Sequence, residues 1–237
     1  MTTGRPARDP ERIEAMFDRI VPHYDLMNRL MTAGLDRRWR AAAAAAAAAP
    51  PGRPILDACC GTGDLSLALA RRYPGTPVTG LDFSQAMLAR ARLKAVSAAA
   101  AVEFVHGDLL ALPFADDGFG AVTVGWGVRN VADLARAFAE MVRVAAPGAP
   151  VVCLEATTPA GAAGRRFHAV WFERIVPAMG ALVTGDAEAY AYLPASVRSF
   201  PDADGLAAVM RAAGLRHVRY RLFGFGAMAL HVGEAPS

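Results

Sequence analysis

Near position 60, a carboxylate and two glycines stand in the order that ligand-binding turns of α/β proteins use. Residues 55–58 (Ile-Leu-Asp-Ala) are predicted to form a strand, Gly61 and Gly63 a tight turn, and Asp64 the start of a helix. Ligands of open α/β sheets bind at the carboxyl ends of such strands, and glycine lets the backbone approach them closely. The sequence therefore predicts a binding site that includes Asp57, Gly61 and Gly63.

This turn departs from the pattern of dinucleotide-binding loops. Those loops usually carry a third glycine three residues after the second, and Ser66 occupies that position here. Asp64 also places a carboxylate at the helix N-terminus, where a pyrophosphate needs open N–H groups. Both departures disfavour NAD, and with it a nucleotide-dependent oxidoreductase. They favour a nucleoside that has no phosphate and carries a positive charge, and S-adenosylmethionine (SAM) is such a ligand.

Two further acidic positions follow at the ends of the next predicted strands. Asp82 lies about twenty residues after the glycines, the usual distance for an acid that binds ribose hydroxyls. Asp108 is placed to accept from an adenine amino group while Leu109 packs on the ring. In the alternative interpretation, Asp57, Asp64 and Asp82 only cap helices and turns.

Short apolar runs alternate with helical stretches between residues 54 and 155. Such alternation predicts βαβ units and therefore an α/β fold with a doubly wound, mostly parallel sheet. The strands are expected at 55–58, 78–81, 102–105, 121–126 and 151–155, and the helices between them at 64–72, 84–96 and 132–145.

Helices are also expected before and after this alternating region. Pro10 at a first helical position predicts a helix that ends at Pro22, and two more should follow at 25–31 and 35–49. Beyond residue 155 we expect a helical region at 163–181, a polar link, a helix at 202–213, and strands at 216–223 and 227–232. One domain is predicted, with residues 1–50 as tail and helical cap and residues 51–237 as a core with a helical insert near 160–200.

Composition excludes several classes of protein. The formal net charge is only +3 and the densest basic cluster lies within residues 37–40, so nucleic-acid binding is not expected. The three cysteines form no Cys-x-x-Cys pair, and no residues show metal-ligand spacing, which predicts a reduced cytoplasmic protein without a metal. The alanine tract at 41–49 is too short for a bilayer, which takes roughly 20 residues, and contact with the membrane surface stays open.

Several separated blocks extend over most of the chain. They are FDRI (17–20), YDLMN (24–28), GLDRRWR (34–40), GVRNV (127–131), EMVRV (140–144), YAYLPAS (190–196) and GAMALHVG (226–233). These blocks resemble signatures of the menaquinone/ubiquinone-biosynthesis C-methyltransferase family (MenG/UbiE). The resemblance implies a Rossmann-like class I SAM-dependent methyltransferase that methylates a ring carbon of a polyprenylated quinol and releases S-adenosylhomocysteine.

The resemblance also implies where the cofactor binds. The family's cofactor contacts fall on Thr62, Asp82, Asp108 and Leu109. The last two replace a usual Asn-Ala pair, although an aspartate still accepts from an adenine amino group. SAM is therefore the expected cofactor, through Asp57, Gly61, Thr62, Gly63, Asp82, Asp108 and Leu109.

Methylation of a quinol carbon requires loss of the neighbouring hydroxyl proton, exclusion of water and alignment of the reacting atoms. Arg129, Asn130 and Tyr24 are the predicted catalytic residues. Arg129 stays protonated, so its expected role is to stabilise a phenolate or hold a water, which Asn130 orients. The alternatives are a salt bridge for Arg129 and simple packing for Tyr24. Further candidates for proton handling are His23, Asp25, Glu155 and His231.

The expected reaction is conversion of demethylmenaquinol to menaquinol. The alternatives are the polyprenyl benzoquinol of the ubiquinone pathway, another small aromatic, or a partner protein that keeps the fold without the chemistry. Apolar residues recurring over 167–182 are expected in the core, in a channel for the isoprenoid tail, or at a homodimer face. A basic and apolar N-terminal cap would allow peripheral contact at the inner face of the membrane.

Overall fold

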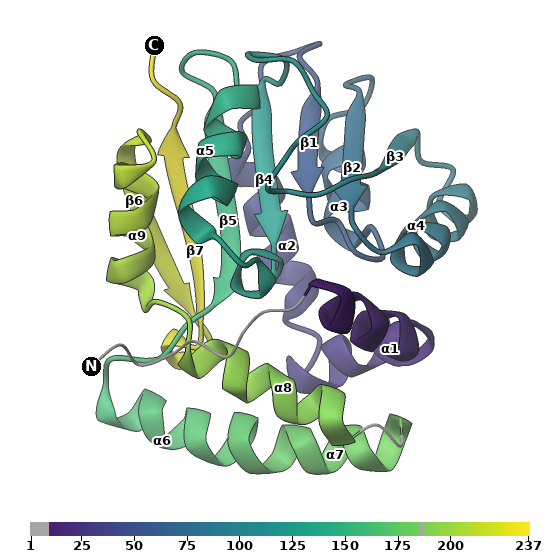
Figure 1. Ribbon diagram of the computed structural model, residues 1–237, viewed down its shortest axis with the longest axis vertical. Coiled ribbons are helices and arrows are strands. Elements are labelled where there is room, and N and C mark those ends of the chain that lie inside the picture. The colour runs from purple at the N-terminus through teal and green to yellow at the C-terminus, as the bar shows by residue number, and fades with distance from the viewer. Residues whose placement is uncertain (1–9, 185–186) are drawn as a thin grey trace.

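A seven-stranded sheet forms the centre of the molecule (Figure 1). The computed structural model describes residues 10–184 and 187–237. The strands are β1 (Ile55–Ala58), β2 (Val78–Asp82), β3 (Val102–His106), β4 (Ala121–Gly125), β5 (Pro150–Ala156), β6 (Arg216–Phe223) and β7 (Met228–Glu234). Their order is β3-β2-β1-β4-β5-β7-β6, with β1 to β5 parallel and β7 antiparallel to both of its neighbours, β5 and β6. The predicted doubly wound, mostly parallel α/β fold is confirmed.

The central strands are continuous apolar runs because helices cover both of their faces. Every residue of β1 and β2 is buried. On β1, Asp57 lies beside Gly80 of β2 and Thr123 of β4, so a carboxylate is enclosed between two strands. Since β1 lies between β2 and β4, the direction of the chain connections reverses at β1, and a crevice opens there at the carboxyl ends of the strands.

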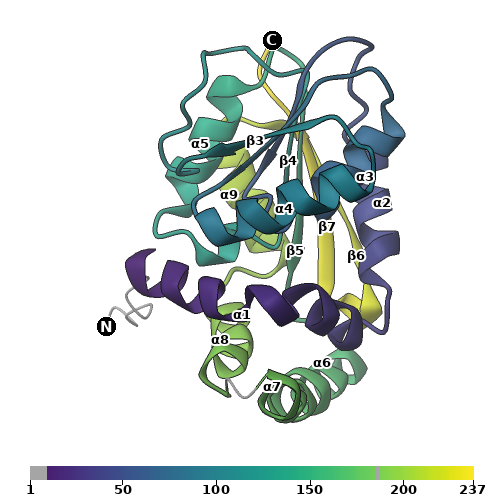
Figure 2. The same ribbon diagram turned by 90° about the vertical axis from the view of Figure 1, so that its right-hand side faces the viewer.

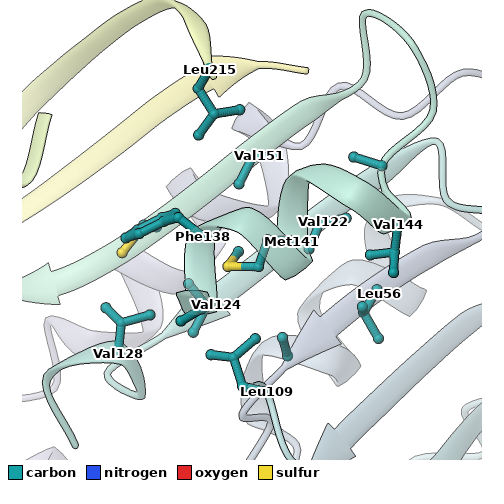
Figure 3. Packing of buried hydrophobic residues seen from close by; sticks show 14 of the residues in the cluster. Leu56, Leu109, Val122, Val124, Val128, Phe138, Met141, Val144, Val151 and Leu215 are labelled. Atoms are coloured by element: carbon teal, nitrogen blue, oxygen red, sulfur yellow. The ribbon is translucent and has the colours of Figure 1, made fainter. Parts of the chain in front are cut away.

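Two layers of helices enclose the sheet. One face is covered by α2 (Asp36–Ala46), α3 (Asp64–Arg72) and α4 (Gln85–Ser97), and the other by α5 (Leu134–Val144) and α9 (Ala203–Ala212). Figure 3 shows Phe138 and Met141 of α5 packed over Val122 and Val124 of β4. All four side chains are fully buried. The site therefore rests on a rigid support.

The first helix differs from its prediction. Pro22 does not end it, because a single helix α1 extends over Pro10–Met31 with the proline inside. An internal proline removes one backbone hydrogen bond and costs roughly 3 kcal/mol. Met16 and Ile20 before it and Met27 after it pack in one apolar cluster. Burial of side chains from both halves offsets that cost.

The insert also differs from its prediction. It consists of α6 (Ala162–Val170), a π-helical turn (Trp171–Ile175), α7 (Val176–Thr184) and α8 (Ala187–Arg198). The prediction of a polar link after residue 181 is wrong over residues 187–198, because these residues form helix α8. Tyr190 and Val197 of α8 are buried, and a side chain in place of Gly180 of α7 would collide with the Tyr190 ring. Close packing against neighbouring helices therefore sets this segment's structure.

Helix α1 lies between the sheet domain's α4 and the insert helices α7 and α8 (Figure 2). Together, α1 and the insert cover the carboxyl ends of β1, β2 and β4. The strand expected at 121–126 stops one residue early, at Gly125. Trp126 has a left-handed backbone (φ 57°), which turns the chain out of the sheet toward this covered edge.

Candidate functional site

The turn after β1 brings backbone to the edge of the sheet without side chains in the way. Gly61 (φ 55°) and Gly63 (φ 81°) both have left-handed backbones. No atom lies within 4 Å of the place where a Cβ of Gly61 would stand, and Gly61 lines a cleft. Gly63 instead packs behind the turn, where its Cβ would meet Ala91 and Phe104 at 3.0–3.1 Å. One glycine therefore admits a ligand and the other admits the neighbouring helix and strand.

Asp82, at the end of β2, is bound to this turn. Its carboxylate accepts the Gly61 N–H at 2.7 Å and the Ser84 N–H at 3.0 Å. Only 4% of the residue is exposed, and burial raises its pKa to about 6 although the backbone donors act in the opposite direction. Asp82 is therefore mostly ionised at neutral pH and presents a carboxylate to the cleft.

This cleft, which Gly61 and Asp82 line, is called the nucleoside cleft. Asp108 stands exposed at its rim and accepts the Leu110 N–H at 2.9 Å. A buried carboxylate beside apolar walls suits a ribose and a base, and the open space at Gly61 suits close approach of a ligand. These residues fit the nucleoside of SAM. The apolar walls are formed by Leu81, Phe83, Met87, Leu109 and Val131.

The predicted cofactor residues separate into two groups. Gly61, Asp82, Asp108 and Leu109 line the nucleoside cleft. Asp57, Thr62 and Gly63 are not among its lining residues and support the turn from behind. Direct contact of these three with the cofactor stays a prediction, and their support of the turn is what the structure describes.

Asp57 shows this supporting role most clearly. It is fully buried and accepts hydrogen bonds from Ser66 Oγ at 2.6 Å and Thr123 Oγ1 at 3.1 Å. Burial raises its pKa to about 7, although both hydroxyl donors lower it. Asp57 thus connects β1, β4 and the first turns of α3 beneath the glycine turn.

A second cavity adjoins the cleft and is called the apolar cavity. Its walls come from α1, the insert and the residues after β4. Phe17, Tyr24 and Trp126 line both cavities, so these three rings stand where the two meet. The other apolar lining residues include Met16, Ile20, Met27, Met31, Phe172, Leu193 and Met228.

The polar groups of the apolar cavity gather near this junction. Arg129 Nη1 donates to Glu155 Oε1 at 2.7 Å and to the Trp126 carbonyl at 2.8 Å. Asn130 lines the nucleoside cleft and accepts at 3.1 Å from the hydroxyl of Tyr192, which lines the apolar cavity. Two buried donors, Arg129 Nε and Asn28 Nδ2, have no hydrogen-bond partner within the part of the chain that the structure describes. Such donors fit a ligand that offers oxygen atoms.

The charges of these groups follow from burial. Burial by itself would lower the pKa of Arg129, but the facing Glu155 carboxylate outweighs it and raises that pKa, so Arg129 stays cationic. Burial raises the pKa of Tyr24, and the nearby charge of Arg129 offsets this only in part. Tyr24 is therefore a neutral phenol at pH 7. The junction holds a fixed positive charge and hydrogen-bonding groups, and neither residue is a base.

Arg129 forms the salt bridge with Glu155 and also lines the apolar cavity, and its catalytic role stays a prediction. The two histidines lie elsewhere. His23 is exposed on α1, and His231 is buried on β7, where its Nε2 lies 2.8 Å from the Ala203 carbonyl oxygen. Neither is among the residues that line the two cavities.

Sequence reasoning missed Trp126 as a site residue. It was expected to end a strand, and its left-handed backbone follows from packing that local patterns do not reveal. The guanidinium of Arg40 stacks 4.6 Å from the centre of its ring. Phe17 and Tyr192 lie within quoted signature blocks, which was the available signal for them.

Comparison with known proteins is consistent with this geometry. The model of the ubiE/COQ5 methyltransferase family matches residues 6–235. The chain belongs to this family. A Thermus thermophilus protein named demethylmenaquinone methyltransferase is 47% identical over 93% of this chain and all of its own length. A Geobacter sulfurreducens protein named ubiquinone/menaquinone biosynthesis C-methyltransferase is 38% identical over 99% of this chain and 92% of its own.

Solved structures share the fold at low sequence identity. A SAM-dependent methyltransferase from Thermotoga maritima superimposes with a TM-score of 0.63 at 18% identity, covering 93% of this chain and 98% of the other. The [4+2]-cyclase SpnF superimposes with a TM-score of 0.62 at 18% identity, covering 94% and 95%. The predicted class I methyltransferase fold is confirmed, and the fold alone does not fix the reaction.

Among residues 10–184 and 187–237, no three His, Cys, Asp or Glu side chains are grouped to hold a metal ion, and independence from metal stays a prediction. Within the same described ranges, no helix combines the length and apolar character needed to cross a membrane.

The raised pKa of Asp82 predicts that nucleoside binding weakens in acid. Protonation removes the carboxylate that accepts ribose hydroxyls, so the affinity for S-adenosylhomocysteine should fall about tenfold between about pH 7.5 and pH 5. Isothermal titration calorimetry at both pH values measures this. The pKa of Asp57 is also raised into this range, so the Asp82→Asn variant is the control. It should bind weakly with little pH dependence, and an unchanged pH dependence in that variant would exclude Asp82 as its source.

Proposed function

We propose that this protein is a SAM-dependent C-methyltransferase that converts demethylmenaquinol to menaquinol. The observation that carries the proposal is the junction, where a nucleoside cleft and an apolar cavity share Tyr24 and Trp126 beside the cation of Arg129. A polyprenylated quinol has an apolar body and hydroxyl oxygens, which match this cavity and its buried donors. Relatives named for the same reaction support the choice of substrate.

The chemistry assigns a task to each junction residue. A quinol carbon becomes strongly nucleophilic when a neighbouring hydroxyl loses its proton. The fixed charge of Arg129 favours the phenolate because a charge pair is stronger away from bulk water. When bound, SAM supplies an electrophilic methyl group on a positively charged sulfur.

The remaining junction residues orient and enclose. Asn130, held by the Tyr192 hydroxyl, orients the substrate oxygen or the water that removes the proton. Tyr24 donates a hydrogen bond as a neutral phenol, and the walls of α1 and the insert exclude other water. Aligning two reactants in this way supplies much of the rate enhancement of such reactions.

The polyprenyl benzoquinol of the ubiquinone pathway is the second candidate, because one relative is named for both pathways. The decisive experiment measures transfer of labelled methyl from SAM to reduced demethylmenaquinone and, in parallel, to the reduced demethylated benzoquinone. We expect product from the naphthoquinol. Product from both would mean a dual role, and no product from either with intact cofactor binding would reject the quinol substrates.

Substitution Arg129→Lys tests the phenolate role while a cation still faces Glu155. Lysine lacks the planar guanidinium group, which donates hydrogen bonds to both Glu155 and the Trp126 carbonyl. Turnover should therefore fall at least about tenfold. Affinity for S-adenosylhomocysteine should stay within about twofold, because Arg129 does not line the nucleoside cleft.

The matched control is Arg143→Lys, the same change in an ion-paired arginine of α5 outside both cavities. It should leave turnover near that of the unsubstituted protein. An equal loss of turnover and cofactor affinity in Arg129→Lys would contradict the assignment of Arg129 to the substrate side.

We also propose that the protein is cytoplasmic and meets its substrate at the inner face of the membrane. Exposed apolar side chains on α6, the π-helical turn and the loop before β7 lie among exposed arginines, which suits an anionic lipid surface. This lipid patch consists of Phe167, Val170, Ile175, Phe225, Arg165, Arg166 and Arg174. A homodimer, the other predicted partner, stays a prediction that sedimentation equilibrium tests.

Sedimentation with vesicles tests the lipid patch. The protein should pellet with phosphatidylglycerol vesicles and less with phosphatidylcholine alone, and the double variant Arg165→Glu, Arg166→Glu should bind several-fold less. Arg71→Glu with Arg72→Glu is the charge-matched control, since both side chains are exposed at the end of α3 remote from the insert. Equal loss of binding in the two variants would argue against a specific patch.

A further inference from the structure

Behind the glycine turn lies a group of charged side chains centred on Lys94, the only lysine in the sequence. Lys94 Nζ is 3.0 Å from Asp25 Oδ2 and 3.2 Å from Thr62 Oγ1, and it also contacts Asp64 Oδ1. Thr62 Oγ1 in turn donates to Asp25 Oδ1 at 2.6 Å. The lysine, which has three donors, therefore faces three acceptors, and the group is called the Lys94 cluster.

The Lys94 cluster joins four parts of the chain. Asp25 belongs to α1, Thr62 to the glycine turn, Asp64 to the start of α3, and Lys94 to α4. The three charged side chains are only 18–26% exposed, so water screens their attraction incompletely. These contacts hold the N-terminal helix against the turn that bears Gly61.

The charges of the cluster are maintained by its cations. Burial by itself would raise the pKa of Asp64, but Arg40 and Lys94 outweigh it and hold that pKa below its usual value. Arg40 also lies 3.6 Å from Asp64 Oδ2 and stacks on Trp126, which lines both cavities. A continuous set of contacts therefore leads from α1 through the cluster to a shared wall of the site.

Helix α1 is itself a wall of both cavities. Phe17 and Tyr24 line the nucleoside cleft and the apolar cavity together. Figure 2 shows α1 alongside α4. A second polar contact joins these helices, because Ser84 Oγ at the start of α4 donates to Asp18 Oδ1 at 2.6 Å. Asp18 and Asp25 are seven residues apart, so both contacts lie on one face of α1.

We propose that Lys94 is a positioning residue that fastens α1 over the bound cofactor. Asp25 is adjacent to Tyr24, so fixing Asp25 against the turn fixes the rotation of α1 that directs Tyr24 to the junction. The same contacts cover the nucleoside cleft and slow the loss of its ligand. The inference rests on the assignment of that cleft to SAM and is independent of the methyl acceptor.

A single lysine permits a direct test on the unsubstituted protein. An amine-reactive acetylating ester modifies Lys94 and the α-amino group only, and mass spectrometry follows the Lys94 peptide separately. Saturating S-adenosylhomocysteine should slow the acetylation of Lys94 by at least about fivefold, since the closed cluster holds the amine in ion pairs. Added N-acetyl-lysine in the same tube reports the reagent's own reactivity.

Two outcomes of the labelling would overturn the proposal. An unchanged rate would mean that the cluster does not respond to the ligand, and a faster rate would mean that ligand binding opens it. Failure of S-adenosylhomocysteine to bind the unsubstituted protein at all would instead reject the proposed function, so the two failures are distinct.

Variants then separate positioning from general stability. Lys94→Met keeps the aliphatic stem and removes the charge, and it should raise the dissociation rate of S-adenosylhomocysteine roughly tenfold, as loss of one partner of a desolvated ion pair does. Lys94→Arg should restore part of the slow dissociation. Arg90→Met is the control, because Arg90 lies 3.9 Å from Asp25 and is half exposed, and it should change the rate less than about twofold.

A double-mutant cycle with Asp25→Asn completes the test. Once Asp25 is neutral, Lys94→Met should add much less to the dissociation rate than it does alone, because the two residues act through one contact. Independent, additive effects would contradict the proposal. In the single variant Lys94→Met, the Asp25 carboxylate loses its lysine partner, which can impair folding. The double variant removes that carboxylate as well, so it can be measured even if Lys94→Met folds poorly.

Discussion

The hydrogen bond from the Gly61 N–H to the Asp82 carboxylate is the contact on which the site depends. It joins the turn after β1 to the end of β2, 21 residues along the chain. The turn can reach that carboxylate only with left-handed backbone at its glycines, and only if β1 and β2 are parallel neighbours. Asp57 holds the same turn from below. The sheet order, the positions of the glycines and the buried carboxylates are thus all needed to hold the glycine turn in place.

Different parts of the chain form the two cavities at this edge of the sheet. The sheet and its connecting turns form the nucleoside cleft from short, rigid segments. Helix α1, the π-helical turn and α8 form most of the apolar cavity, and they lie far apart in the sequence. A Rossmann-like core that is common to many methyltransferases therefore becomes selective through what covers it. The low identity of solved structures with the same fold agrees with this division.

The sequence was most informative where structure is local. The predicted helix at 64–72 matches α3, and the strand at 216–223 matches β6, because periodicity and turn residues determine them directly. Asp82 was identified from its distance to the glycines. The continuous α1 through Pro22 and the helix α8 were not predicted, because tertiary packing decides both. Contact of Thr62 with the cofactor stays a prediction, because a motif marks a turn and does not show which side of it each residue faces.

Phe17, Tyr24 and Trp126 line both cavities. A ligand in either cavity therefore changes the wall that the other ligand meets. Binding linkage is reciprocal. If the nucleoside changes the affinity for the second ligand through these rings, the second ligand changes the affinity for the nucleoside by the same factor. The aromatic partition consequently makes the two binding equilibria a single coupled system, in which sequence changes at the partition alter both affinities at once.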